Sequence, residues 1–152
     1  MKTLCSLLAV LALVSCAGSR DALTVKQFQL KDMDVGNISE PSVRMEILRR
    51  LHGAVSAEEK ASRQGQYYTV LWEDPAGRNQ GPVEVIFEYQ QGATASRVKG
   101  KKQTFAASDT RGKAEFAVIG RDFTVNGRVL AWKITLRRGD RIVASKQSYL
   151  WR

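Results

Sequence analysis

The feature that most constrains the fold is the alternation of apolar and polar residues in the second half of the chain. Apolar residues at every second position place one side of a strand against a core and leave the other side in solvent. Residues 83–90, 114–118 and 129–136 follow this pattern. In the last segment, the side expected to face the core consists of Leu130, Trp132, Ile134 and Leu136. The alternation predicts a mainly β fold.

Four further segments complete a set of about seven strands. They are an irregular first strand at 23–30, an aromatic and β-branched strand at 67–72, and strands at 101–106 and 142–151. Residues 101–106 are expected at a sheet edge, where lysines discourage pairing with other chains. Seven short strands separated by turn signals indicate an antiparallel β-sandwich. A small barrel with a helix packed on it is the alternative.

The last predicted hairpin carries a tryptophan, Trp132, in its first strand. The strand count and pattern over residues 66–151 resemble immunoglobulin-like and fibronectin type III modules, whose final two strands are similar to this hairpin. The resemblance implies an immunoglobulin-like sandwich, although the sequence lacks the cysteine pair of the immunoglobulin disulfide.

A helical segment, about residues 40–64, is expected as an insertion after the first strand. Apolar residues recur at three- and four-residue spacing, which is typical of an amphipathic helix; they are Val43, Ile47, Leu48 and Leu51. Ser39 is the expected N-cap, and His52 with Gly53 is expected to end the helix. Ser56 and Glu59 have the spacing of a capping box, so we expect a second, short helix there.

The N-terminus has the layout of a secretory signal. Lys2 is the only charged residue before Arg20, and an apolar run follows from Leu4 to Val14. A basic start followed by a short apolar run is typical of an export signal. The run is shorter than the roughly 20 residues that a membrane-spanning helix needs.

The end of this run, Leu13-Val14-Ser15-Cys16, resembles the lipobox of bacterial lipoprotein precursors. The resemblance implies cleavage between Ser15 and Cys16 and attachment of a diacylglycerol to Cys16, whose fatty acids hold the protein to a membrane. Ala17 after the cysteine favours the outer membrane, with the domain facing the periplasm. The alternative is ordinary secretion with an unmodified cysteine. The expected organisation is a signal peptide at 1–15, a lipidated tether at 16–22 and one domain at 23–152.

The chain is basic, with 24 lysines and arginines, 15 acidic residues and a formal net charge of +9. For an exported protein this favours an anionic neighbour, such as a phosphate-bearing lipid, an acidic glycan or an acidic envelope protein. Nucleic acid is not an expected partner outside the cytoplasm. The alternative is that the charge only keeps the domain soluble.

The densest basic run lies at 97–102, and a second lies around the last predicted turn. Together they predict a cationic surface for anionic ligands, since lysine and arginine bind phosphate and carboxylate by charge-assisted hydrogen bonds. Its candidate residues are Arg97, Lys99, Lys101, Lys102, Arg137, Arg138 and Arg141. The alternative is a solvated loop and edge strand.

Residues suited to catalysis are few. His52 is the only histidine and lies at a predicted helix end, where a capping or surface role is expected rather than that of a catalytic base. One histidine without a free cysteine does not suffice for a standard zinc site, so no metal or cofactor is expected. Paired carboxylates could serve a glycoside hydrolase, but a solvated strand face is the preferred interpretation; the candidates are Glu73, Asp74, Glu84 and Glu88.

Arg138-Gly139-Asp140 matches the integrin-binding tripeptide, but a hairpin turn explains these residues equally well. The leading hypothesis is a non-enzymatic envelope lipoprotein with a binding or structural role. One alternative is a carbohydrate- or cell-wall-binding module with an aromatic stacking face, whose candidates are Tyr67, Tyr68, Trp72, Trp132 and Trp151. The other is a periplasmic hydrolase that uses carboxylates. The oligomeric state is not predicted.

Overall fold

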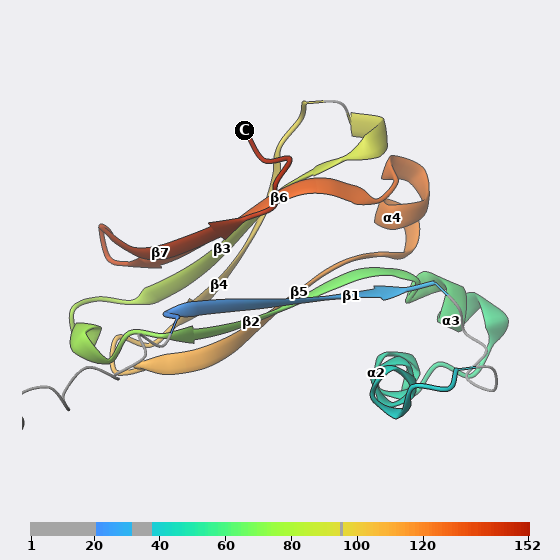
Figure 1. Ribbon diagram of the computed structural model, residues 1–152, viewed down its shortest axis with the longest axis horizontal. Coiled ribbons are helices and arrows are strands. Elements are labelled where there is room, and N and C mark those ends of the chain that lie inside the picture. Colours follow the sequence, from blue (N-terminus) through green and yellow to red (C-terminus); the bar gives the residue numbers. More distant parts are fainter. Residues whose placement is uncertain (1–20, 32–37, 95) are drawn as a thin grey trace, which may run out of the picture.

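The computed structural model describes residues 21–31, 38–94 and 96–152 as two antiparallel sheets packed face to face, with helices at one end (Figure 1). The predicted signal peptide, the cleavage site and Cys16 lie outside the described residues. Within the described part, no helix has the length and apolar character to cross a membrane.

The smaller sheet has three strands in the order β1-β2-β5, and the larger has four in the order β4-β3-β6-β7. The strands of the smaller sheet are β1 (Leu23–Leu30), β2 (Gly65–Glu73) and β5 (Arg111–Ile119). Those of the larger sheet are β3 (Val83–Gln91), β4 (Lys99–Phe105), β6 (Val129–Arg138) and β7 (Arg141–Gln147). The predicted antiparallel β-sandwich of about seven strands is confirmed, and β4 is an edge strand as expected.

Two helices form the predicted insertion between β1 and β2: α2 (Pro41–Leu51) and α3 (Ala57–Ser62). The N-cap of α2 is Glu40 rather than Ser39, and Pro41 opens the helix, where its missing N–H costs nothing. The capping box before α3 is present. The Glu59 amide donates to Ser56 Oγ at 3.1 Å, and the Ser56 amide donates to Glu59 Oε2 at 2.9 Å.

A third helix, α4 (Gly120–Asn126), connects β5 to β6 and was not predicted. Short 3-10 helices follow β2 at Pro75–Gly77 and β3 at Gly92–Thr94. The final strand is shorter than expected, because β7 ends at Gln147 and the chain turns at Ser148.

The main core lies between the two sheets and is rich in aromatic side chains. Phe87 is fully buried at its centre, with ring centroids 4.6 Å from Tyr68, 4.9 Å from Tyr89 and 5.3 Å from Phe116. Alternation along β3 buries every second residue, as the period-two pattern predicts.

The expected alternation in β6 is wrong at its first residues. Leu130 is 42% exposed, while Val129 and Ala131 are buried. The cause is a β-bulge, because Gln90 pairs with Ala131 but the next residue, Gln91, pairs with Val129. Leu130 is thereby left out of the pairing, which reverses the side on which the preceding residue lies.

A second, smaller core joins α2 to the outer face of the three-stranded sheet. Ile47 and Leu51 of the helix pack against Leu30 and Tyr67. The guanidinium of Arg50 lies 4.2 Å from the centre of the Tyr67 ring, an additional cation–π contact. The helix therefore covers the end of the sheet where β1 finishes and β2 begins (Figure 1).

Candidate functional site

The predicted cationic surface is not formed as expected, and Arg138 is the clearest exception. Its side chain is fully buried and its Nε donates to Asp74 Oδ2 at 2.7 Å. Its remaining nitrogens donate to the carbonyls of Gly81, Ala107 and Asp109 at 3.1, 3.0 and 2.6 Å. The assignment of Arg138 to a ligand-binding surface is wrong, and its burial also prevents the Arg-Gly-Asp tripeptide from presenting an arginine to an integrin.

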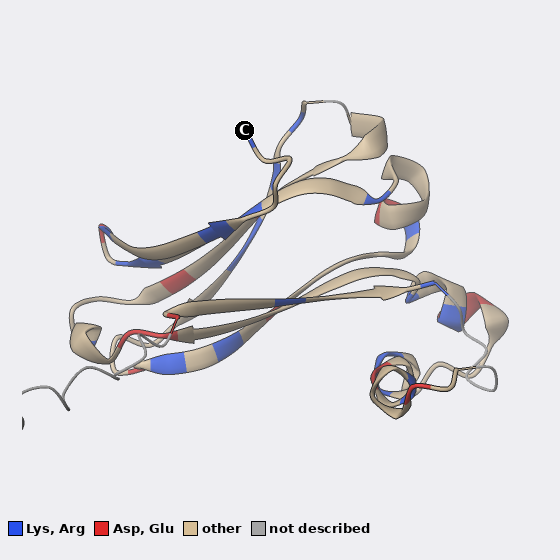
Figure 2. Ribbon diagram, viewed as in Figure 1, with Lys and Arg blue, Asp and Glu red and all other residues tan. Residues whose placement is uncertain are grey.

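Most of the other residues of this predicted surface bind groups of the protein itself. Lys102 Nζ donates to Glu84 Oε1 at 2.6 Å, and Arg137 Nε donates to Glu84 Oε2 at 3.0 Å. Arg141 adds a second cation to Asp74, at 2.9 Å. Arg97 is exposed in the loop before β4. Basic residues occur on strands of both sheets and on the helices (Figure 2).

Lys101 has a structural role at a sheet edge. Its Nζ donates to the carbonyl of Ala117 on β5. Beside it, Gln103 Nε2 donates to the Glu115 carbonyl at 2.7 Å and Gln103 Oε1 accepts from the Glu115 amide at 3.3 Å. Side chains of β4 thus occupy the backbone groups along the edge of β5 and close the gap between the sheets.

Lys99 belongs to a polar cluster that fixes α4. Its Nζ lies 2.7 Å from both Asp122 Oδ1 and Gln91 Oε1, and the Tyr89 hydroxyl donates to Asp122 Oδ2 at 3.3 Å. Burial of Asp122 opposes its ionisation, but hydrogen bonds from Lys99, Asn126 and Tyr89 outweigh this and lower its pKa. Burial, followed by the Asp122 charge, raises the pKa of Tyr89 to about 12.

The candidate catalytic carboxylates do not face one another. Glu84 and Glu88 lie four residues apart on β3, about 13 Å along the strand, which exceeds the 6.5–9.5 Å that an inverting glycosidase needs. Both oxygens of Glu84 accept hydrogen bonds, and Asp74 is buried beside Arg138. Among the described residues, no group of three or more histidine, cysteine or acidic side chains is placed to hold a metal.

The aromatic residues proposed for sugar stacking are mostly structural. Tyr68, Trp72 and Trp132 belong to the main core, and Tyr67 lies under α2. Trp151 is partly exposed, and its neighbour Tyr149, which was not singled out from the sequence, is 95% exposed. A stacking face built from the predicted set is therefore absent from the described surface.

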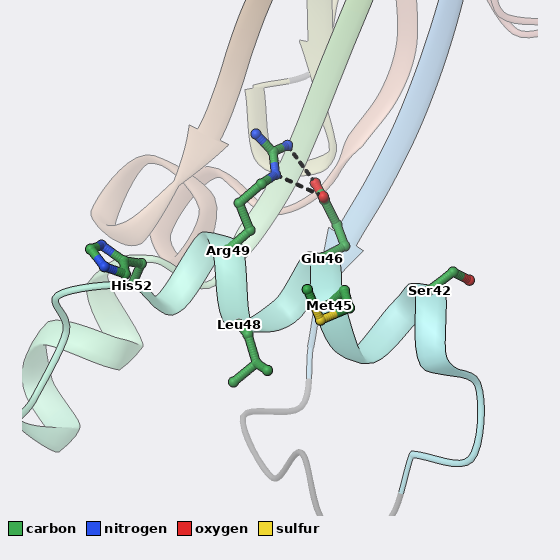
Figure 3. A pocket seen from close by; sticks show the side chains of 6 residues that line it. All are labelled: Ser42, Met45, Glu46, Leu48, Arg49 and His52. Atoms are coloured by element: carbon green, nitrogen blue, oxygen red, sulfur yellow. Dashed lines mark hydrogen bonds and ion pairs between the residues drawn. The ribbon is translucent and has the colours of Figure 1, made fainter.

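The helix α2 carries a second apolar side that the fold does not use. Met45 is 66% exposed and Leu48 is 49% exposed, and both point away from the sheets (Figure 3). They line an open hollow of about 590 Å³ with Ser42, Glu46, Arg49 and His52. The sequence pattern assigned Leu48 and Val43 to the buried side, which is wrong. His52 caps the helix and is exposed, as expected.

A groove lined mainly by polar residues adjoins this hollow, shares Glu46 and Arg49 with it, and lies between α2 and the outer face of the three-stranded sheet. It has a volume of about 290 Å³ and is lined by Lys26, Gln27, Phe28, Glu46, Arg49 and Thr69. Lys26 pairs with Thr69 across β1 and β2, and Thr69 pairs with Glu115 on β5. These three residues therefore form one row across the floor, and α2 forms the wall.

Ion pairs connect residues of the wall with one another and with Glu115 on the floor. Arg49 Nη2 lies 2.8 Å from Glu46 Oε1, and its Nη1 lies 3.2 Å from Glu115 Oε1. The hydrogen bond from Arg49 is the main cause that lowers the pKa of Glu46. For Glu115, partial burial opposes ionisation, but Arg49, Lys113 and Arg50 together lower its pKa. Both carboxylates are therefore kept charged by an excess of nearby cations.

The sequence pattern favours a core-covering role for α2 and does not single out Met45, Lys26 or Thr69 as site residues. The second apolar side could have been recognised from Met45 and Leu48, which are three residues apart and follow a different face from Ile47 and Leu51. The row of Lys26, Thr69 and Glu115 could not have been recognised in the sequence, because it depends on the register of three strands that are distant in sequence. Comparisons with known protein families, with curated proteins and with solved structures found no match for this chain.

Proposed function

We propose that this protein is an envelope lipoprotein, cleaved between Ser15 and Cys16 and tethered by lipid on Cys16, with a non-enzymatic binding role. The order of a basic start, a short apolar run and Leu13-Val14-Ser15-Cys16 supports the anchor. After cleavage Cys16 is the only cysteine left, and acylation removes a free thiol that an oxidising compartment would expose to oxidation.

The placement of the helices favours binding at the end of the domain away from the tether. The domain begins beside Asp21, whose carboxylate pairs with Lys146 at 2.8 Å. From there β1 runs its eight residues, about 26 Å, before the chain reaches the end covered by α2. Figure 1 shows α2 at the end of the sandwich where β1 finishes, and a lipid on Cys16 would leave that end free to face the periplasm.

The observation that carries the binding role is the exposed apolar side of α2. A helix of this kind needs one apolar side to pack on the sheet, and Ile47 with Leu51 supplies it. Met45 and Leu48 on the other side gain nothing from the fold and fit the helix-in-groove mode of protein recognition. We therefore infer a protein partner, because the proposed tether would hold this side away from the membrane surface.

The anchor is tested by metabolic labelling with a clickable fatty acid. The wild-type chain is expected to take up label and to migrate as a processed form, whereas Cys16→Ser should lose the label and accumulate as the uncleaved precursor. Label that persists in Cys16→Ser would contradict the anchor.

The binding role is tested by placing a photo-crosslinking residue at Leu48 in cells that keep the native envelope. We expect a discrete adduct that is abolished by Met45→Glu in the same chain, since a charge there disrupts an apolar contact. The matched control is the same crosslinker at Thr104, an exposed position on β4. Equal adducts at both positions, or none at Leu48, would refute a binding role for α2.

A further inference from the structure

We propose that the groove between α2 and the outer face of β1, β2 and β5 binds a carboxylate of an acidic peptide segment. The inference rests on the proposed binding role of this end of the domain and names the chemistry of the ligand. Its key residues are Lys26 and Thr69 on the floor and Arg49 on the wall.

The floor positions a cation and a hydroxyl side by side. Lys26 and Thr69 are direct neighbours across two paired strands, whose spacing is about 4.8 Å. A carboxylate placed above them can accept from the Lys26 ammonium with one oxygen and from the Thr69 hydroxyl with the other. Lys26 is exposed, and no ion pair joins it to another residue in the described ranges.

The charge around the groove is unbalanced. Four cations gather here against two carboxylates, Glu46 and Glu115; the cations are Lys26, Arg49, Arg50 and Lys113. Three of the cations are paired with these two carboxylates. Glu115 Oε1 by itself has three cationic neighbours, with nitrogen atoms of Arg49, Arg50 and Lys113 at 3.2, 3.9 and 3.4 Å. A bound anion would balance this excess of positive charge, and Arg49 could direct some of its guanidinium N–H groups toward the anion.

The surroundings favour a carboxylate on a peptide over a dianionic phosphate. Two acidic side chains already lie at the groove, so a ligand with a double negative charge meets more repulsion than one with a single charge. Next to the floor row lies the row of Thr24, Leu71 and Lys113, in which Leu71 is 39% exposed. A peptide can place an acidic residue over Lys26 and an apolar neighbour over Leu71.

The groove volume, about 290 Å³, lies just below the range of ligand pockets, which span ~300–1,000 Å³. The space accordingly suits one or two side chains of a larger partner rather than a whole cofactor. Affinity for an isolated short peptide is expected to be weak, with Kd on the order of 1 mM.

The test is a titration of the full chain, purified in a non-ionic detergent, followed by backbone amide NMR shifts. The probes are acetyl-Leu-Glu-Ala-amide, the same peptide with Gln in place of Glu, and inorganic phosphate. The acidic peptide is expected to shift amides of Lys26, Thr69 and Arg49, and the neutral peptide to bind about tenfold more weakly, as expected for one charge-assisted contact.

Lys26→Gln should weaken binding of the acidic peptide about tenfold, and Thr69→Val should weaken it severalfold. The matched control is Lys102→Gln, another exposed lysine on an edge strand but in the opposite sheet, which should leave binding unchanged. Shifts confined to the region of Lys99 and Lys102, equal binding of both peptides, or tighter binding of phosphate would overturn the proposal. A crosslink at Leu48 without peptide binding would refute the groove alone and leave the binding role of α2 in place.

Discussion

Replacing Arg138 with methionine tests whether the buried cluster around Asp74 stabilises the sandwich. The substitution keeps a long, flexible side chain but removes every nitrogen that bonds Asp74 and the carbonyls of Gly81, Ala107 and Asp109. These groups come from the loops after β2 and β4, and Arg138 itself ends β6. One side chain thus joins three segments that are far apart in sequence.

The expected loss is set by the charge that stays behind. Breaking a buried ion pair by removing one partner costs about 3–5 kcal/mol. In the variant, Asp74 Oδ2 keeps its ion pair with the half-exposed Arg141, at 2.9 Å. Because Asp74 is not left without a cation, the lower end of that range applies. For a domain of this size a loss of about 3 kcal/mol corresponds to a fall in Tm of about 10 °C.

The assay is urea unfolding of the full chain, followed by tryptophan fluorescence. The midpoint should fall while the slope m stays constant, because the surface exposed on unfolding is unchanged. The control is Arg137→Met, the neighbouring arginine that pairs with Glu84 and is 41% exposed, where a much smaller loss is expected because solvent screens the pair. If the two variants lose equal stability, the argument from burial is wrong.

Two pH dependences follow from the cluster around α4. The pKa of Asp122 lies below its ordinary value of 3.8. The stability that the charged Asp122 contributes is therefore present above pH 3.8 and is lost as the pH falls through the lower folded-state pKa. Urea midpoints measured between neutral and acid pH should show this loss, and Asp122→Asn should reduce the fall of the midpoint at acid pH. Burial raises the pKa of Tyr89 from 10.0 to about 12, so its contribution to stability is complete below pH 10 and is lost as the pH rises toward 12. The difference in phenolate absorbance between wild type and Tyr89→Phe measures the titration of Tyr89. A Tyr89 that titrates at its ordinary pKa would contradict the argument from burial.

The strands could be predicted because their signal is local. Residues 83–90 alternate except at Ile86, and the alternate residues Val83, Val85, Phe87 and Tyr89 are all buried in β3. The helix α4 gave no such signal, because it is seven residues long and contains Gly, Thr and Val. It is held by tertiary contacts instead: Lys99 bonds Asp122, and Gln91 Nε2 donates to the carbonyls of Asp122 and Gly127. Contacts of that kind are invisible in a sequence window.

Arg138 illustrates why the predicted cationic surface failed. An arginine next to Arg137 and a Gly-Asp turn has the local character of a surface residue. Its burial depends on Asp74, which lies 64 residues away, and on three backbone carbonyls. Basic composition therefore predicts neither where charge is exposed nor whether it is already paired, since a buried arginine and a free one look alike in sequence.

The candidate site lies on α2, outside the main core of the sandwich. The main core joins both sheets through fifteen buried residues, whereas the core beneath α2 has four: Leu30, Ile47, Leu51 and Tyr67. The exposed side chains Met45, Leu48 and Lys26 belong to neither core, so substituting them leaves the packing of the sandwich intact. A rigid sandwich can thus carry a helix whose outer surface changes to suit a partner, which is how binding sites are commonly placed on stable folds.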